Sequence, residues 1–200
     1  RRSGMTVVDI DQDGDNDFVF PSSITTPQLM RNLGSSSAFF PGGSVTLEME
    51  DLPEFTTWDL NMDFADLTGD GLPDMMAVVN YEKGFCTFQK QVSYYKNEGP
   101  RSNPTFSFQR LIFGSTQDSS DQRAMWVALN DINGDGLQDL FVAESWIFET
   151  NRHHRVYQIL NDGTTTTPSL PFSVAITELG DVLPDRIWFD ADSANPAVEI

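Results

Sequence analysis

The chain has 200 residues, of which 39% are hydrophobic and 12% are aromatic, and it contains a single cysteine, Cys86. This composition is typical of a folded domain with a substantial core, and it excludes an internal disulfide framework. The net charge of −18 at pH 7 argues against nucleic-acid partners, whose phosphates would repel the chain, and no apolar run approaches the roughly 18 residues that membrane insertion requires.

The first predicted element is a β-hairpin with an acidic loop at its tip. Met5–Val8 and Asp17–Phe20 are short runs rich in β-branched and aromatic residues, which is typical of strands. Between them, acidic residues occupy loop positions 1, 3, 5 and 9, and Gly14 stands at position 6, where a tight curl needs positive φ. These acidic residues are Asp9, Asp11, Asp13 and Asp17. The backbone carbonyl of Asp15, at position 7, would complete the ligands of a cation.

The same pattern occurs twice more along the chain. In the second loop the candidate ligands are the side chains of Asp66, Thr68, Asp70 and Asp74 and the carbonyl of Leu72. In the third loop they are the side chains of Asp131, Asn133, Asp135 and Asp139 and the carbonyl of Leu137. Apolar runs flank both loops, so the sequence predicts hairpins over residues 5–20, 64–79 and 125–143, with almost no helix.

The chemistry of the three loops favours calcium. Carboxylate, amide, hydroxyl and carbonyl oxygens without His or Cys select a hard cation. A helical EF-hand would need Glu at position 12, but that position holds Phe20, Ala77 and Val142. The alternative is a set of metal-free acidic turns. Against it, two carboxylates 4 Å apart repel by about 4 kcal/mol at an effective dielectric near 20.

A strand, D-x-[DNT]-x-D-G-x-x-D and a second strand occur together at residues 9–17, 66–74 and 131–139, and this arrangement resembles FG-GAP/VCBS repeats. The resemblance implies an all-β fold, a β-propeller of four-stranded antiparallel blades like that of integrin α-subunits. It also implies calcium in the loop between the two inner strands of each blade. It does not by itself fix a function, because one fold serves many.

The spacing of the repeats predicts how the chain is divided. The loops begin at Asp9, Asp66 and Asp131, which lie 57 and 65 residues apart. We expect one propeller segment over residues 1–200, with blade units at about 1–53, 54–118, 119–179 and a partial unit at 180–200. Asp190–Glu199 would be a degenerate fourth loop. About three blades and part of a fourth would make the chain a fragment of a larger propeller.

The second half of each unit holds a third strand that ends in an Asn-x-Gly turn, followed by an outer strand with phenylalanine. The phenylalanines are Phe39 and Phe40, Phe106 and Phe108, and Phe172. Tyr81–Lys90 and Ser145–Arg155 are predicted to be loops longer than a tight turn, and therefore candidates for partner contact. The second contains a basic cluster, Arg152–Arg155. Trp58, Trp126 and Trp188 recur near the first strands, either as packing between blades or as a platform for sugar.

Motifs of common enzyme classes are missing from the sequence, which shows no G-x-S-x-G, H-E-x-x-H or Walker loop. The prediction is a calcium-binding, non-enzymatic segment located outside the cell or at its surface. It would act in recognition or adhesion toward a protein or glycan, or as a structural module that contacts neighbouring copies or domains. The alternative is a part of a polysaccharide-degrading enzyme of the lyase kind.

Overall fold

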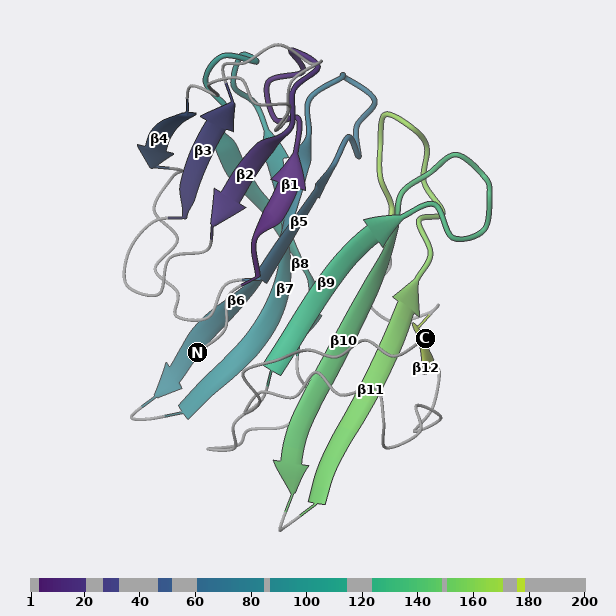
Figure 1. The fold of residues 1–200 in the computed structure, drawn as a ribbon. Helices are drawn as coiled ribbons and strands as arrows, with labels where there is room; N and C mark the ends of the chain where they lie inside the picture. Colours follow the sequence, from purple (N-terminus) through teal and green to yellow (C-terminus); the bar gives the residue numbers. More distant parts are fainter. Residues whose placement is uncertain are drawn as a thin grey trace, which may run out of the picture.

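A computed structural model of the chain describes residues 4–20, 27–32, 47–51, 61–84, 87–114, 124–148, 151–170 and 176–178. These residues form twelve strands in three four-stranded antiparallel sheets and contain no helix (Figure 1). Within the same ranges there is accordingly no helical segment that is long and apolar enough to cross a membrane. The predicted all-β fold is confirmed.

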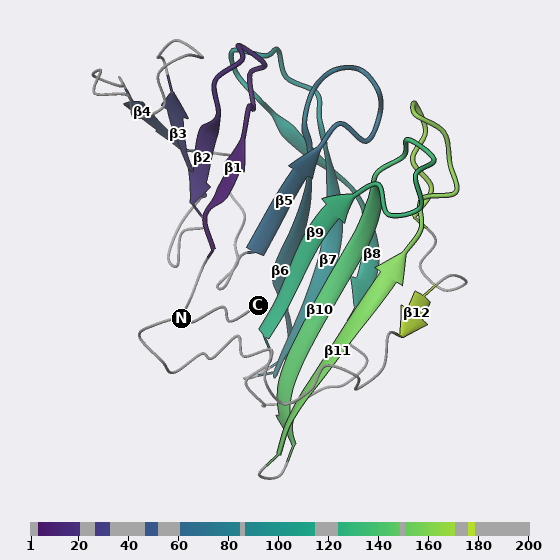
Figure 2. The ribbon, with the colours of Figure 1, turned by 45° about the vertical axis from the view of Figure 1, so that its right-hand side comes forward.

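Each sheet is one blade in which every strand pairs with the next strand along the chain. Blade 1 contains β1 (Thr6–Val8), β2 (Asp17–Phe20), β3 (Gln28–Asn32) and β4 (Leu47–Asp51). Blade 2 contains β5 (Asn61–Ala65), β6 (Asp74–Gly84), β7 (Thr87–Asn97) and β8 (Phe106–Gly114). Blade 3 contains β9 (Ala124–Asn130), β10 (Asp139–Phe148), β11 (Asn151–Ile159) and β12 (Ile176–Glu178). The three blades do not close into a ring (Figure 2).

The first strands of the three blades, β1, β5 and β9, lie side by side, as inner strands of propeller blades do (Figure 1). Thr6 Oγ1 donates to the carbonyl of Met62 at 2.7 Å. The side chains of Asn61 and Asp63 accept the backbone N–H groups of Val127 and Leu129, each at 2.8 Å. These bonds satisfy edge groups of β9 that its own sheet leaves unpaired, and so they fix the position of blade 3 beside blade 2.

Blade 2 is buried on both faces, and its β6 strand shows why. Met75 and Ala77 pack toward blade 1, in a cluster that includes Val19 and Leu29. The alternating residues Met76 and Val78 pack toward blade 3, in a cluster that includes Leu140 and Val142. Because side chains alternate along a strand, a strand buried on both faces must be apolar at every position, which explains the continuous run Met75–Val79. Full burial of each such side chain contributes roughly 1.5–3 kcal/mol.

The two segments expected to be variable loops form strands instead. The β6 and β7 strands continue to a pairing of Gly84 with Thr87, and β10 and β11 continue to a pairing of Phe148 with Asn151. Only residues 85–86 and 149–150 separate the paired ends, so the prediction of long loops is wrong. Backbone pairing continues past the apolar part of each strand. The resulting ribbons extend at the end of the molecule opposite the three acidic loops (Figure 1).

Several sequence features lie outside the described residues. These are the Asp190–Glu199 segment, Trp58, Trp188, Cys86, Phe39, Phe40 and Phe172. The described outer strand of blade 1 is β4, at Leu47–Asp51, which is C-terminal to the predicted Phe39–Phe40 position. Phe106 and Phe108 begin the outer strand of blade 2, as predicted, and Trp126 lies in β9.

Candidate metal centre

The three acidic loops curl at the positions that the sequence predicts. We call them loop 1 (residues 9–17), loop 2 (66–74) and loop 3 (131–139). The glycine at position 6 has a φ of 96°, 83° and 84° in Gly14, Gly71 and Gly136. Position 4 also has positive φ in each loop. The sequence signal is weaker there, because loops 2 and 3 have glycine at this position, Gly69 and Gly134, whereas loop 1 has Gln12, with a φ of 57°.

The aspartates at positions 1 and 5 hold this curl with the same hydrogen bonds in every loop. At position 1, Asp9, Asp66 and Asp131 each accept the N–H of the position-6 glycine, at 3.1, 2.9 and 2.9 Å. At position 5, Asp13, Asp70 and Asp135 each accept the N–H of the position-7 residue, at 2.9, 3.0 and 2.8 Å. The position-7 residues are Asp15, Leu72 and Leu137. These bonds turn two carboxylates of each loop inward.

The aspartate at position 9 has a second role that sequence reasoning missed. Asp17, Asp74 and Asp139 are fully buried, with 0% exposure. One carboxylate oxygen of each accepts the N–H of the position-2 residue, at 3.1, 3.1 and 3.0 Å. The other oxygen accepts the N–H of an asparagine at or just beyond the end of the third strand, at 2.7, 2.9 and 2.7 Å. Position 9 therefore ties the loop to the third strand of its blade.

Burial has an electrostatic consequence for two of these carboxylates. Desolvation raises the pKa of Asp17 to about 6, although the N–H groups of Asn32 and Ile10 oppose the shift. Desolvation likewise raises the pKa of Asp74 to about 6, against the N–H groups of Asn97 and Leu67. Neighbouring loop aspartates raise both pKa values further. Without a cation, these two groups therefore ionise near pH 6, well above the usual range of an aspartate.

The partner asparagine completes the link. The side-chain amides of Asn32, Asn97 and Asn161 donate to the carbonyl of position 8, at 3.4, 3.2 and 3.2 Å. In blades 2 and 3 the side-chain oxygen also accepts two backbone N–H groups of the following turn. A Cβ on Gly99 or Gly163 would lie 2.3 or 2.2 Å from a backbone oxygen, so the turn needs glycine there. The Asn-x-Gly signal was visible in the sequence, but its contact with the acidic loop was not.

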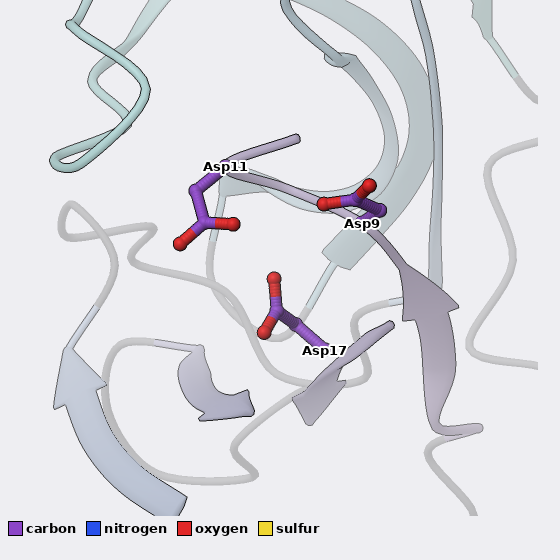
Figure 3. A group of neighbouring side chains, drawn as sticks. All are labelled: Asp9, Asp11 and Asp17. Carbon is purple, nitrogen blue, oxygen red and sulfur yellow. The ribbon is translucent and has the colours of Figure 1, made fainter. Parts of the chain in front are cut away.

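Loop 1 brings its carboxylates closest together. Oxygens of Asp9, Asp11 and Asp17 lie within 4.8 Å of one another and face a common space (Figure 3). Asp11 also forms an ion pair with Arg31, on β3. The side chain of Asp15 is 5% exposed, and burial followed by the charges of nearby aspartates raises its pKa.

Loops 2 and 3 have a neutral side chain at position 3 in place of Asp11. In loop 3, Asn133 donates to Asp135 at 2.8 Å. In loop 2, Asp70 lies 3.3 Å from Lys96. Burial acts to raise the pKa of Asp70, but the N–H of Leu72, the nearby Thr68 hydroxyl and Lys96 outweigh it and hold the pKa below its usual range.

The donor set fits a hard divalent cation. Every candidate side-chain ligand in the three loops is an oxygen donor, as calcium prefers. Thr68 Oγ1, at a predicted ligand position, is buried and makes no hydrogen bond of ordinary geometry. Its nearby Asp70 is itself a candidate ligand, and a cation in loop 2 would give this buried oxygen a partner of good geometry.

Comparison with known proteins gives one match. A family model described as an FG-GAP-like repeat matches residues 7–77, which include loops 1 and 2 and the whole of blade 1. No curated protein matches the chain. No solved structure matches it either. Loop 3 lies beyond the matched residues but repeats the hydrogen bonds of the two loops within them.

Proposed function

The chain carries an FG-GAP-like repeat, a β-propeller-type module, over residues 7–77, and from this premise we propose that it is a calcium-stabilised propeller segment that acts outside the cell in recognition or adhesion. The observation that supports calcium best is the shared geometry of the three loops, together with the buried Thr68 hydroxyl, which makes no hydrogen bond of ordinary geometry. Calcium would bind the side chains at positions 1, 3, 5 and 9 and the carbonyl at position 7. Its role is structural, because it neutralises carboxylates that the fold places side by side.

The proposed location follows from the expected affinity. Extracellular calcium modules typically bind with dissociation constants of about 10⁻⁴–10⁻³ M, and such sites fill only where calcium is abundant. The charge of −18 makes the metal-free protein strongly self-repelling, and bound calcium would reduce this repulsion. We therefore propose that the protein acts in the extracellular space or at the cell surface, where calcium is abundant.

Alanine at Asp135 tests the calcium proposal. In saturating calcium, Asp135→Ala should lose one bound ion and about 2–3 kcal/mol of stability, because a ligand that binds only the folded state stabilises it by about 2.7 kcal/mol at a hundredfold excess over Kd. In EDTA the loss should be small, since Asp135 is exposed. Calorimetric titration and melting curves measure both effects.

The matched control is Asp162→Ala, which removes an exposed carboxylate from the same blade outside the loop. It should bind as many calcium ions as the wild type. A wild-type protein whose melting temperature is the same in calcium and in EDTA would contradict the proposal.

A binding role is proposed over an enzymatic one, because FG-GAP repeats are typically non-catalytic. The partner would be a protein or glycan, or neighbouring copies or domains in an extracellular assembly. The proposed contact surface is the end formed by the β6–β7 and β10–β11 ribbons, which extend away from the loops (Figure 1). Rigid strand ribbons can present a partner-binding edge at little entropic cost.

Shortening the two ribbons tests this surface. Tyr81 pairs with Gln89 and Ser145 with His154, so an Asn-Gly turn can replace residues 82–88 and 146–153 without changing the register. The shortened protein should keep its calcium-dependent melting but lose binding to glycan arrays or to cell surfaces. Unchanged binding would move the contact surface elsewhere on the blades.

A further inference from the structure

The residue that precedes the bridging asparagine differs among the blades. It is Arg31 in blade 1, Lys96 in blade 2 and Leu160 in blade 3. The three positions correspond, because Phe18 pairs with Met30, Met75 with Tyr95 and Leu140 with Ile159, each pair one residue from the position compared. A cationic side chain therefore stands beside loops 1 and 2, and an apolar one beside loop 3.

The two cations are held differently. Arg31 forms its ion pair with Asp11, and the side chains are 6% and 13% exposed. Its other terminal nitrogen donates to the carbonyl of Ser102, in blade 2, at 3.4 Å. Lys96 and Asp70 are 33% and 36% exposed, so water screens their interaction. Arg31 is thus a buried, permanent charge inside loop 1, while Lys96 is a surface neighbour of loop 2.

Loop 1 also differs in its own charge. Its four side-chain ligand positions hold four aspartates, whereas loops 2 and 3 have Thr68 and Asn133 at position 3 and three aspartates each. Arg31 pairs with Asp11, the one additional carboxylate. With this pair counted as neutral, all three loops present the same ligand charge, that of three carboxylates.

We propose that Arg31 sets the calcium affinity of loop 1, by making the Asp11–Arg31 pair equivalent to the neutral ligands at position 3 of loops 2 and 3. This inference rests on the proposed calcium function and concerns how strongly one site binds. Calcium affinity rises with the charge of the ligands, and a guanidinium on a ligand opposes it by repelling the cation. The guanidinium cannot lose its proton, and separating it from Asp11 would take an acidic partner away from a buried charge. Arg31 therefore lowers calcium affinity while it stabilises the metal-free loop.

The test uses a background in which only loop 1 is intact, made with Asp70→Ala and Asp135→Ala. In this background, calorimetric titration should show calcium binding to Arg31→Leu about tenfold or more tighter than to the parent, because four unpaired carboxylates then face the ion. Asp11→Asn should bind about tenfold or more weaker, because the positive charge of the guanidinium is then no longer offset by Asp11. The double variant Asp11→Asn with Arg31→Leu should return to within about threefold of the parent. Arg31→Lys, which keeps the charge, should also stay close to the parent.

A structural readout accompanies the titration. In EDTA, Arg31→Leu should melt below the parent and gain more than the parent on addition of calcium. If that variant fails to fold without calcium, the double variant decides, because its position 3 is neutral as in loops 2 and 3. Calcium affinity of the double variant as weak as that of Asp11→Asn alone would overturn the inference, as would Arg31→Leu binding no tighter than the parent. A wild type that binds no calcium would overturn the proposed function itself, so the two failures are distinguishable.

Discussion

Asp139→Ala should cost about 3–5 kcal/mol of stability even in EDTA, a far larger loss than the metal alone explains. The carboxylate is fully buried and accepts the N–H groups of Ile132 and Asn161 at 3.0 and 2.7 Å. Alanine leaves both donors buried without a partner, and each such group costs about 1–3 kcal/mol. The loop would lose the bond from its position-9 carboxylate to Asn161 N–H, and the Asn161 side-chain bond to the Gln138 carbonyl would remain. Urea unfolding in EDTA measures this loss directly.

Asp135→Ala is the internal comparison for this result. Asp135 is exposed, and the donors that it releases, Leu137 N–H and the Asn133 amide, can bond to water. In EDTA its cost should stay below about 1 kcal/mol, and only calcium should reveal a larger one. Similar losses for the two variants in EDTA would show that position 9 is merely another ligand and not the anchor of the blade.

The stability of the protein should fall with rising pH in EDTA and become nearly independent of pH in calcium. Folding raises the pKa of Asp17 and of Asp74 to about 6, so the folded state holds their protons more tightly than the unfolded state does. Their favourable contribution is complete below about pH 4, the region of the unfolded pKa, and is lost as pH rises to about 6. The expected loss in EDTA is roughly 2 kcal/mol for each group, after allowance for solvent screening.

In calcium the dependence on pH in the same window should largely disappear, because the growing stabilisation by calcium offsets the loss seen in EDTA. The cation binds the ionised carboxylates, so protons compete with it, and the stabilisation by calcium grows until both groups are ionised. Denaturant unfolding between about pH 4 and pH 7, with and without calcium, measures the two slopes. Asp74→Asn provides the control, because an amide does not titrate and the slope in EDTA should decrease. Equal slopes in the two buffers would contradict the assignment of these carboxylates to calcium.

The sequence by itself determined the loops and the strands beside them. Glycine at position 6 and the alternation of apolar residues are local signals, since they depend on backbone φ and on the period of a strand. The spacing of Asp9, Asp66 and Asp131 predicted repeated four-stranded sheets, and three of them are present. Local patterns of this kind are reliable where the backbone conformation of each residue depends on residues of its own hairpin.

Only the tertiary structure decided which of these residues act together. Asn161 reaches Asp139 from 22 residues away, and Arg31 reaches Asp11 from 20, so neither contact has a local sequence signal. The ribbons at Tyr81–Lys90 and Ser145–Arg155 are strands because neighbouring backbones pair there, whatever the polarity of the side chains. Strand pairing and burial join segments that are distant in the sequence. In the sequence, the position-9 aspartate resembles one ligand among four. In the structure it is buried, and its hydrogen bonds hold the loop to the blade.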